Sequence, residues 1–424
     1  MPGSQRESLA DRFRALHHRN FRLFWGGQLV SLIGTWMQSV GQGWLMHRLT
    51  DSAWMLGVLG FAQFLPVTAL SLSAGVVVDR VDKRRLVLVT QMLALVQAAA
   101  LATLVASGVV KPWMVLSLAL VFGAITAFDL PARQAFLVEM VGKEDLPNAI
   151  ALNSAAFNAA RVVGPAVAGV LVASLGETWC FALNAVSYLF VIATLLRMDL
   201  PPRVRPAGGD AATTLGEGIR YARGTPAILN LLLLLGVTCG LGFQYMILLP
   251  VYADRILAAG PKGYGMMVAA FGLGSLMSAV VMTRRLDRWA LRRNLLVGLL
   301  TAGVSMGVFA WSRALPLTLA MGFVAGFGLI LYVASTNVLL QLTTEDRFRG
   351  RVMSLYTFMF VGTAPVGALL SGGLAQRFGA PVATSVCASI LLGGAGWVMH
   401  RLKILAAREA AASATPPVMT EKVG

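Results

Sequence analysis

Asp79-Arg80-Val81-Asp82-Lys83-Arg84-Arg85 follows a long uncharged stretch, and its Asp-Arg-x-x-x-Arg-Arg pattern recurs 208 positions later as Asp287-Arg288-Trp289-Ala290-Leu291-Arg292-Arg293. The acidic pair Glu144-Asp145 recurs 201 positions later as Glu345-Asp346, and Pro165 has a counterpart at an offset of 200. Three matches in the same order at similar offsets indicate an internal duplication. Two parallel halves around a central path are typical of a transporter.

Uncharged stretches make up most of the chain. Of its 424 residues, 57% are hydrophobic and 13% are charged, whereas about 25% are charged in a soluble domain. This composition excludes a water-soluble globular enzyme. With about 20 residues in each membrane span, we expect an all-α membrane protein with twelve transmembrane helices in two pseudo-symmetric six-helix bundles. The expected spans are residues 23–46, 53–78, 86–110, 112–137, 148–176, 178–196, 227–252, 264–283, 294–312, 314–340, 352–376 and 380–400.

The basic residues are unevenly distributed among the loops. The chain has 35 Lys and Arg against 19 Asp and Glu, a net charge of +16, and 28 of the 35 fall in the tails and in alternate loops. By the positive-inside rule, both termini are cytoplasmic. Because these charges lie between spans, they indicate orientation in a bacterial inner membrane and not binding to nucleic acid. The three cysteines, scattered through apolar stretches, predict neither a disulfide nor a metal site.

These patterns divide the chain into five parts. Residues 1–22 form a cytoplasmic amphipathic segment, 23–197 the first six-helix bundle, 198–226 a cytoplasmic linker, 227–402 the second bundle and 403–424 a disordered tail. Within the linker, Leu215, Ile219 and Ala222 recur at helical spacing and predict a short amphipathic helix.

Two motifs resemble those of the major facilitator superfamily. Gly75-x-x-x-Asp79-Arg80-x-x-Lys83-Arg84-Arg85 is similar to the signature between its second and third helices, with Asp82 where the family usually has glycine. The second resembles the antiporter signature of the fifth helix, with three of its five glycines replaced by alanine. It falls on Ala151, Ala160, Gly164, Pro165, Ala168 and Gly169.

A further run indicates a subfamily. Asp129-Leu-Pro-Ala-Arg133, followed by Asn158-x-x-Arg161-x-x-Gly164-Pro165, resembles the bacterial enterobactin-exporter-like (transmembrane secretion effector) subfamily. The resemblance implies transport by alternating access. It also implies a cytoplasmic latch at the Gly75–Arg85 motif, with Asp287 and Arg288 as its second copy. The alternative is that these loop charges only set the topology.

Three charged residues fall within or beside the fourth and fifth spans: Asp129, Arg133 and Arg161. If those spans form a hairpin turning near Asp145, Asp129 and Arg161 lie at similar depth. A lone arginine there costs about 2.5–3.5 kcal/mol, so we expect Asp129 to be its partner and the candidate proton carrier. Arg161 could also recognise an anionic group. The alternative is a static salt bridge or a side chain that extends to the membrane surface.

Polar residues recur on one face of the first span. Gln28, Ser31, Thr35, Gln38 and Gln42 are spaced by 3, 4, 3 and 4 residues. This face predicts a substrate-facing wall, or else hydrogen bonds between helices. The resemblance implies that helices one, four, seven and ten line a central cavity. Further candidates for that wall are Asn158, Gln244, Tyr245, Tyr332, Ser335, Thr336 and Asn337.

Together these features predict a transporter and not an enzyme. We expect proton-coupled export of an amphipathic small molecule, such as a drug, siderophore or secondary metabolite. The chain has no nucleotide-binding loop and needs no cofactor, so an ion gradient should drive it. Its expected partners are a small-molecule substrate and the lipid bilayer, and we expect it to function as a monomer. The alternatives are an importer, a lipid flippase, or an intramembrane hydrolase using Ser305 of Gly303-Val-Ser-Met-Gly307, a motif without its usual preceding strand.

Overall fold

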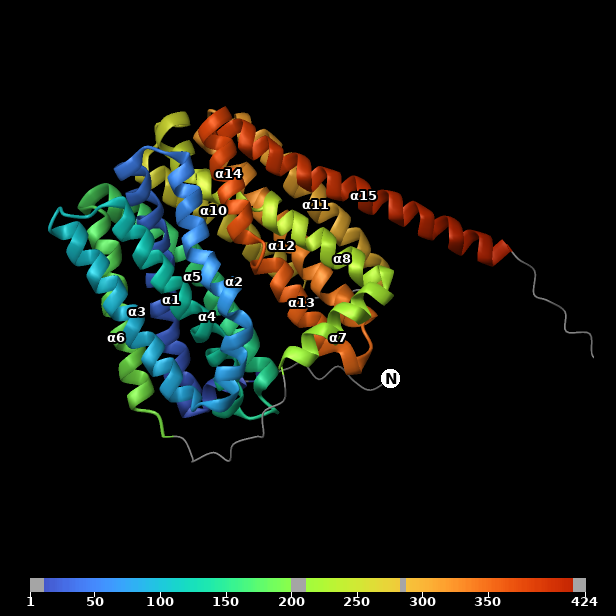
Figure 1. Ribbon diagram of the computed structural model, residues 1–424, viewed down its shortest axis with the longest axis horizontal. Helices are drawn as coiled ribbons and strands as arrows, with labels where there is room; N and C mark the ends of the chain where they lie inside the picture. Colours follow the sequence, from blue (N-terminus) through green and yellow to red (C-terminus); the bar gives the residue numbers. More distant parts are fainter. Residues whose placement is uncertain (1–10, 200–210, 283–286, 415–424) are drawn as a thin grey trace, which may run out of the picture.

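The computed structural model describes residues 11–199, 211–282 and 287–414, and these residues form helices joined by short turns (Figure 1). The predicted N-terminal segment, linker and tail therefore lie partly outside the described residues. The first bundle follows the short helix η1 (Asp11–His17). Its helices are α1 (Arg19–Thr50), α2 (Ala53–Arg80), α3 (Lys83–Ala106), α4 (Pro112–Val141), α5 (Leu146–Leu175) and α6 (Glu177–Leu196).

The second bundle is less regular. Its helices are α7 (Ala211–Gly224), α8 (Pro226–Val237), η2 (Thr238–Gly242), η3 (Gln244–Leu248), α9 (Leu249–Val251), η4 (Tyr252–Ile256), α10 (Gly260–Val281), α11 (Arg288–Trp311), α12 (Leu315–Thr343), η5 (Asp346–Phe348), α13 (Arg349–Val361), α14 (Ala364–Phe378) and α15 (Ala380–Ala414). A helix thus forms where the spacing of Ile219 and Ala222 predicts one, and the buried Ala222 packs it against Val352.

Two predicted spans are interrupted. The seventh runs through α8, η2, η3, α9 and η4, and the eleventh is divided into α13 and α14. Pro365 lies in the first turn of α14, where its missing N–H and its ring end the preceding helix. The two irregular places face each other, because a Cβ added to Gly240 would lie 2.7 Å from the Cβ of Thr363.

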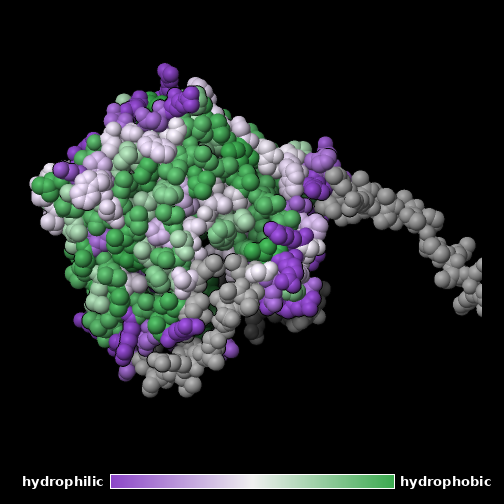
Figure 2. Space-filling view, in the orientation of Figure 1, coloured by the Kyte–Doolittle hydropathy of each residue, from purple (hydrophilic) through white to green (hydrophobic). Residues whose placement is uncertain are grey.

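Eleven helices in the described part of the chain are long and apolar enough to cross a membrane. They match the second to twelfth predicted spans. The helix that matches the first, α1, is not among them; it is 32 residues long, but its polar face lowers its hydropathy. Its role as a span remains a prediction. Figure 2 shows hydrophobic side chains over most of the visible face and hydrophilic ones mainly toward the ends, as expected for a membrane protein.

The two bundles meet mainly through two pairs of helices, α2 with α14 and α5 with α10. Glycines allow both contacts. A Cβ added to Gly372 would lie 2.7 Å from the Cα of Gly57, and one added to Gly265 would lie 2.7 Å from the Cα of Gly169. Backbones this close leave no room for a side chain. Gly265 and Gly272 of α10 therefore lie at the contact between the bundles, whereas Gly274 packs against α12 of its own bundle.

Candidate functional site

A cavity of about 420 Å³ lies between the two bundles. Residues of α1, α2, α4 and α5 form one wall, and residues of η2, η3, α10, α13 and α14 contribute to the other. The volume lies within the range of about 300–1,000 Å³ typical of small-molecule sites. This cavity is the candidate binding site.

Most of the cavity wall is apolar or aromatic. Its aromatic residues include Trp36, Phe64, Phe122, Phe157, Phe243 and Phe360. The sequence did not single them out, because an aromatic residue in a membrane span can equally face lipid. The polar side chains in the wall include Thr35, Gln38, Gln42, Gln63, Arg161 and Gln244. An apolar cavity with a few polar groups suits an amphipathic small molecule.

The polar face of α1 serves two purposes. Thr35, Gln38 and Gln42 lie in the cavity wall, and Gln28 lines a smaller adjacent pocket. Gln38 also joins helices, because its Nε2 donates to Oε1 of Gln97 at 3.0 Å and its Oε1 accepts from Asn184 at 2.8 Å. Each of the two interpretations of this face therefore describes part of it.

The structure separates the remaining cavity candidates. Gln244 lies in the wall, whereas Asn158, Tyr245, Tyr332, Thr336 and Asn337 are not among its lining residues. Tyr332 is buried within the second bundle, and the Oγ1 of Thr238 donates to its hydroxyl oxygen at 2.8 Å. The prediction that α12 contributes to the wall is thus not met in this conformation, because these side chains of α12 pack against their own bundle.

Asp129 lies in the smaller pocket. Its Oδ2 is 2.6 Å from the Nε of Arg133, one turn along α4. Its Oδ1 accepts hydrogen bonds from Thr90 at 2.6 Å and from Gln91 at 2.9 Å. The predicted pair of Asp129 with Arg161 is therefore wrong in this conformation, because Arg133 on the same helix already occupies the carboxylate.

Arg161 faces the main cavity from α5. It is 8% exposed, and its Nε is buried without a hydrogen-bond partner among the described residues. Its Cζ lies 4.8 Å from the ring centre of Phe271 and 5.6 Å from that of Trp36. The guanidinium is thus held by aromatic rings and forms no ion pair with the described part of the chain.

The antiporter-like motif lies on α5, between α1 and α10. A Cβ added to Gly164 would lie 2.6 Å from the Cβ of Trp36 on α1, and Gly169 meets Gly265 of α10. Ala160, Pro165 and Ala168 are also buried. The small residues therefore let α5 approach one helix of each bundle.

The loop between α2 and α3 forms contacts within its own bundle. The side chain of Asp79 lies outside the part of the chain that the structure describes. The side chain of Asp82 caps α3 by accepting from the backbone N–H of Arg85 at 2.8 Å, which is its function in place of the usual glycine. Arg84 donates to the carbonyls of Leu195 and Leu196 at the end of α6, where a cation is favoured.

The remaining described charged residues of this motif, and Asp287 and Arg288 of its second copy, likewise form contacts within one bundle or are exposed. Lys83 Nζ lies 3.7 Å from Oε1 of Glu139, while Arg80 and Arg85 are exposed and a Cβ at Gly75 would meet open space. In the second copy, Asp287 caps α11 by accepting from Ala290 N at 2.6 Å. Arg288 donates to the carbonyl of Leu342 at 2.8 Å. The described contacts of both loops are therefore structural in this conformation.

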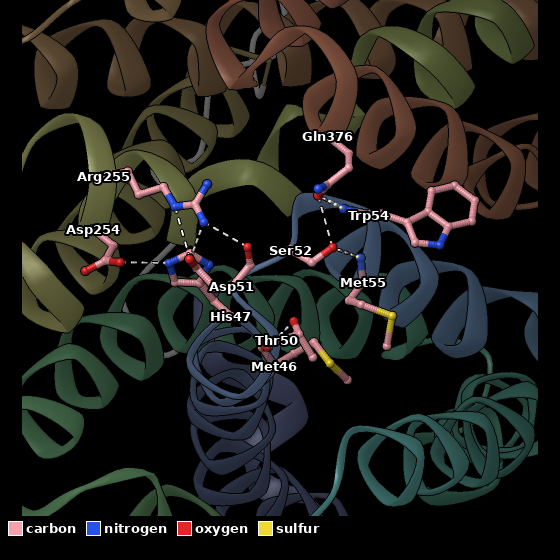
Figure 3. A network of polar contacts seen from close by, with 10 residues as sticks. All are labelled: Met46, His47, Thr50, Asp51, Ser52, Trp54, Met55, Asp254, Arg255 and Gln376. Carbon is pink, nitrogen blue, oxygen red and sulfur yellow. Dashed lines mark hydrogen bonds and ion pairs between the residues drawn. The ribbon is translucent and has the colours of Figure 1, made fainter.

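A polar network joins the bundles at the end opposite these loops (Figure 3). We call it the inter-bundle network; it comprises His47, Asp51, Ser52, Asp254, Arg255 and Gln376. Nε2 of His47 lies 3.0 Å from Oδ2 of Asp254, and Arg255 donates to Oδ1 of Asp51 at 3.1 Å. Ser52 donates to Oε1 of Gln376 at 3.0 Å. The hydrogen bonds and ion pairs between bundles, counted over the described residues, all occur at this end.

Charge stabilises the network. The hydrogen bond from Arg255 lowers the pKa of the Asp51 carboxyl below its ordinary value of 3.8. His47, Asp51 and Asp254 also place ligand atoms of the kind that bind metals within 4.8 Å of one another. Arg255 already pairs with Asp51, and a guanidinium beside a cation is unfavourable, so this group is better described as an ion-pair network than as a metal site.

Ser305, the candidate nucleophile of the alternative hydrolase, lies within α11. It is buried, and its hydroxyl donates to the carbonyl of Ala302 at 3.0 Å. This is an ordinary hydrogen bond of a serine inside a helix, and none of the described residues before the motif forms a strand.

Comparison with known proteins identifies relatives of the whole fold. The chain is 29% identical to the multidrug efflux pump Tap of Mycolicibacterium fortuitum, covering 83% of this chain and 88% of the relative. It is 25% identical to the staphyloferrin A transporter of Staphylococcus aureus, covering 84% and 90%. It is 24% identical to the enterobactin exporter EntS of Escherichia coli, covering 87% and 88%. These relatives are transporters, which confirms the prediction that the chain is not an enzyme and excludes the hydrolase.

Solved structures show the same fold. The nucleoside transporter NupG matches with a TM-score of 0.69 at 12% identity, covering 91% of this chain and 99% of its own. An inward-facing bacterial homologue of the lysosomal transporter Spinster matches with a TM-score of 0.64 at 15% identity, covering 96% of both. A family model described as transmembrane secretion effector matches residues 10–423. The chain therefore belongs to the transmembrane secretion effector family, whose members are transporters of the major facilitator type.

Proposed function

We propose that this protein exports an amphipathic small molecule from the cytoplasm by alternating access, in exchange for protons. The observation that carries the proposal is the cavity of about 420 Å³ between two bundles whose hydrogen bonds and ion pairs to each other, among the residues that the structure describes, lie at one end. A cavity so placed can open to either side of a membrane when the bundles rock against each other.

The orientation follows from the basic loops. The loops at the end opposite the inter-bundle network carry most of the Lys and Arg residues, so that end faces the cytoplasm. We infer twelve spans, with α1 as the first, and cytoplasmic termini in a bacterial inner membrane. In this orientation the network closes the outer side, and the conformation faces the cytoplasm.

Export is the direction that the relatives favour. Two of them are described as an efflux pump and an exporter, Tap and EntS. The small-residue pattern on α5, which resembles the antiporter signature, points the same way. Import and lipid flipping on the same fold remain the competing outcomes of the test below.

Protons are the proposed coupling ion, and no cofactor is invoked. Asp129 is the acid in the pocket beside the main cavity, and the two spaces share Leu32, Thr35, Phe122 and Phe157 as lining residues. A substrate in the main cavity could therefore affect the pair that Asp129 forms with Arg133. Protonation of Asp129 would break this pair and change the packing of α4.

Transport in inverted membrane vesicles tests the proposal. The probes are ethidium and 1-pyrenebutyrate, added outside vesicles that hold an imposed acid interior. Accumulation that requires the protein and collapses with a protonophore is expected. Accumulation driven only by sodium would refute proton coupling, and protein-dependent uptake into whole cells would refute export. Asp129→Asn should abolish the response to the proton gradient, while the exposed Asp346→Asn serves as a control.

A further inference from the structure

Arg161 is a buried cation without a counter-ion. The described residues that line the main cavity include no aspartate or glutamate. Within the described part of the chain, no hydrogen bond or ion pair reaches this guanidinium, and its Nε is buried without a partner. Leaving a charge so placed is costly. The expected compensation is a ligand that supplies the missing negative charge.

The aromatic contacts leave the hydrogen-bonding edge of the guanidinium unused. Phe271 and Trp36 interact with the cation through their ring faces, with Cζ at 4.8 Å and 5.6 Å from the ring centres. Such contacts supply no acceptor to the N–H groups. A planar carboxylate matches those donors in a bidentate arrangement.

A second unpartnered group lies close by. The hydroxyl of Tyr245 is buried with no hydrogen-bond partner among the described residues, and its ring packs against Phe271 at 6.1 Å between ring centres. Phe271 is therefore shared by both unpartnered polar groups. Tyr245 itself does not line the cavity, so the ligand that this site favours is one that pairs with Arg161.

We propose that Arg161 binds a carboxylate or a similar oxyanion of the transported molecule. The apolar part of the molecule would lie against the aromatic wall of the cavity. This inference rests on the proposed function, because it names the class of substrate: amphipathic anions. The site lies between α5 of one bundle and α10 of the other, so a bound anion contacts both sides of the interface that has to move.

Binding to the detergent-solubilised protein tests the proposal without requiring transport. The probes are 1-pyrenebutyrate, its neutral methyl ester and the cation 1-pyrenebutylamine, which share one aromatic body. We expect the butyrate to raise the apparent unfolding temperature most. If it stabilises the protein no more than the ester does, whether both bind or neither, the proposal is wrong.

Variants test whether the preference for the butyrate depends on Arg161. Arg161→Gln should weaken butyrate binding by about 10- to 100-fold and leave ester binding nearly unchanged. Arg161→Lys keeps the charge and should retain a smaller preference for the butyrate. Arg377→Gln is the matched control, because Arg377 also lies over an aromatic ring but is exposed and outside the cavity. An equal loss of binding for all three probes in Arg161→Gln would refute anion recognition.

The two proposals can fail separately. If butyrate binding depends on Arg161 but no probe moves in response to a proton gradient, the anion site stands and proton-coupled export does not. If ethidium and the ester are exported equally well by the wild type and by Arg161→Gln, and the butyrate shows no preference, export stands and the anion site does not.

Discussion

Gly265→Ala is expected to disfavour the conformation described above. The added Cβ would lie 2.7 Å from the Cα of Gly169 and 2.9 Å from its nitrogen. Both are backbone atoms of α5, so no side chain can rotate away and the bundles themselves have to separate. Inserting a methyl group into packing this close costs about 1–3 kcal/mol.

That cost sets the expected change in population. Because 1.4 kcal/mol corresponds to a factor of ten, a cost of about 1–3 kcal/mol lowers the population of the conformation described above by about 5- to 150-fold relative to a conformer in which α5 and α10 have separated. The favourable helix propensity of alanine, about 1 kcal/mol, acts in both conformers and so cancels.

Cys239 provides the assay. It lines the cavity, whereas Cys180 and Cys387 do not, although all three cysteines are buried in the conformation described above. In a background with both of those replaced by alanine, a membrane-impermeant maleimide added to inverted vesicles should label Cys239 from the cytoplasmic side. Gly265→Ala should slow this labelling, and membrane abundance must be measured in parallel.

Two further variants control the interpretation. Gly307→Ala lies in α11, where a Cβ would meet nothing within 4 Å, and should leave labelling unchanged. Gly372→Ala, at the α2–α14 contact, should act in the same direction as Gly265→Ala because its Cβ would lie 2.7 Å from the Cα of Gly57. If both contact variants insert normally and label at the wild-type rate, these glycines do not control the conformational equilibrium.

Three other results are expected. Asp129→Asn and Arg133→Gln should each lower the free energy of unfolding by up to about 3–5 kcal/mol, and the double variant should recover part of that loss. The losses caused by Asp129→Asn and Arg161→Gln should instead simply add in their double variant. Thermal unfolding of the single and double variants measures both comparisons. Since Arg255 lowers the pKa of Asp51, the stabilisation is complete above the ordinary value of 3.8 and is lost as the pH falls through the lower pKa of the folded state. Asp51→Asn should therefore change Cys239 labelling by the same factor throughout about pH 5–8, and a varying factor would contradict this. Arg84→Gln, which removes hydrogen bonds to the end of α6, should lower stability by about 1–3 kcal/mol without changing the labelling rate.

The uncharged stretches predicted helix positions well because charge is so costly inside a membrane. The second to twelfth predicted spans each correspond to one helix or to a consecutive run of helical segments. The interruptions within the seventh and eleventh were not predicted. Pro365 was a local signal for the interruption in the eleventh span. That the two interruptions lie against each other, with Gly240 beside Thr363, does not follow from the spacing within either span.

The partner of Asp129 shows where the sequence argument was incomplete. The hairpin argument estimated the depth of Asp129 and Arg161 in the membrane but not the direction in which each side chain points around its helix. Arg133, four residues after Asp129, was the available signal, because residues at this spacing lie on the same helix face. The orientation of Arg161 toward Phe271 depends on α10, about 110 residues further on, and spacing within one span contains no information about it.

The polar face of α1 explains why its mean hydropathy does not select this helix as a membrane span. Hydropathy scales assign each glutamine the cost of meeting lipid, but Gln28, Gln38 and Gln42 are each less than 5% exposed. Gln38 has its amide hydrogen-bonded to α3 and α6, so most of that cost is never incurred. A helix surrounded by other helices can therefore be more polar than a lipid-facing one and still cross the membrane. Low hydropathy at this position is thus consistent with a central helix that forms part of the cavity wall.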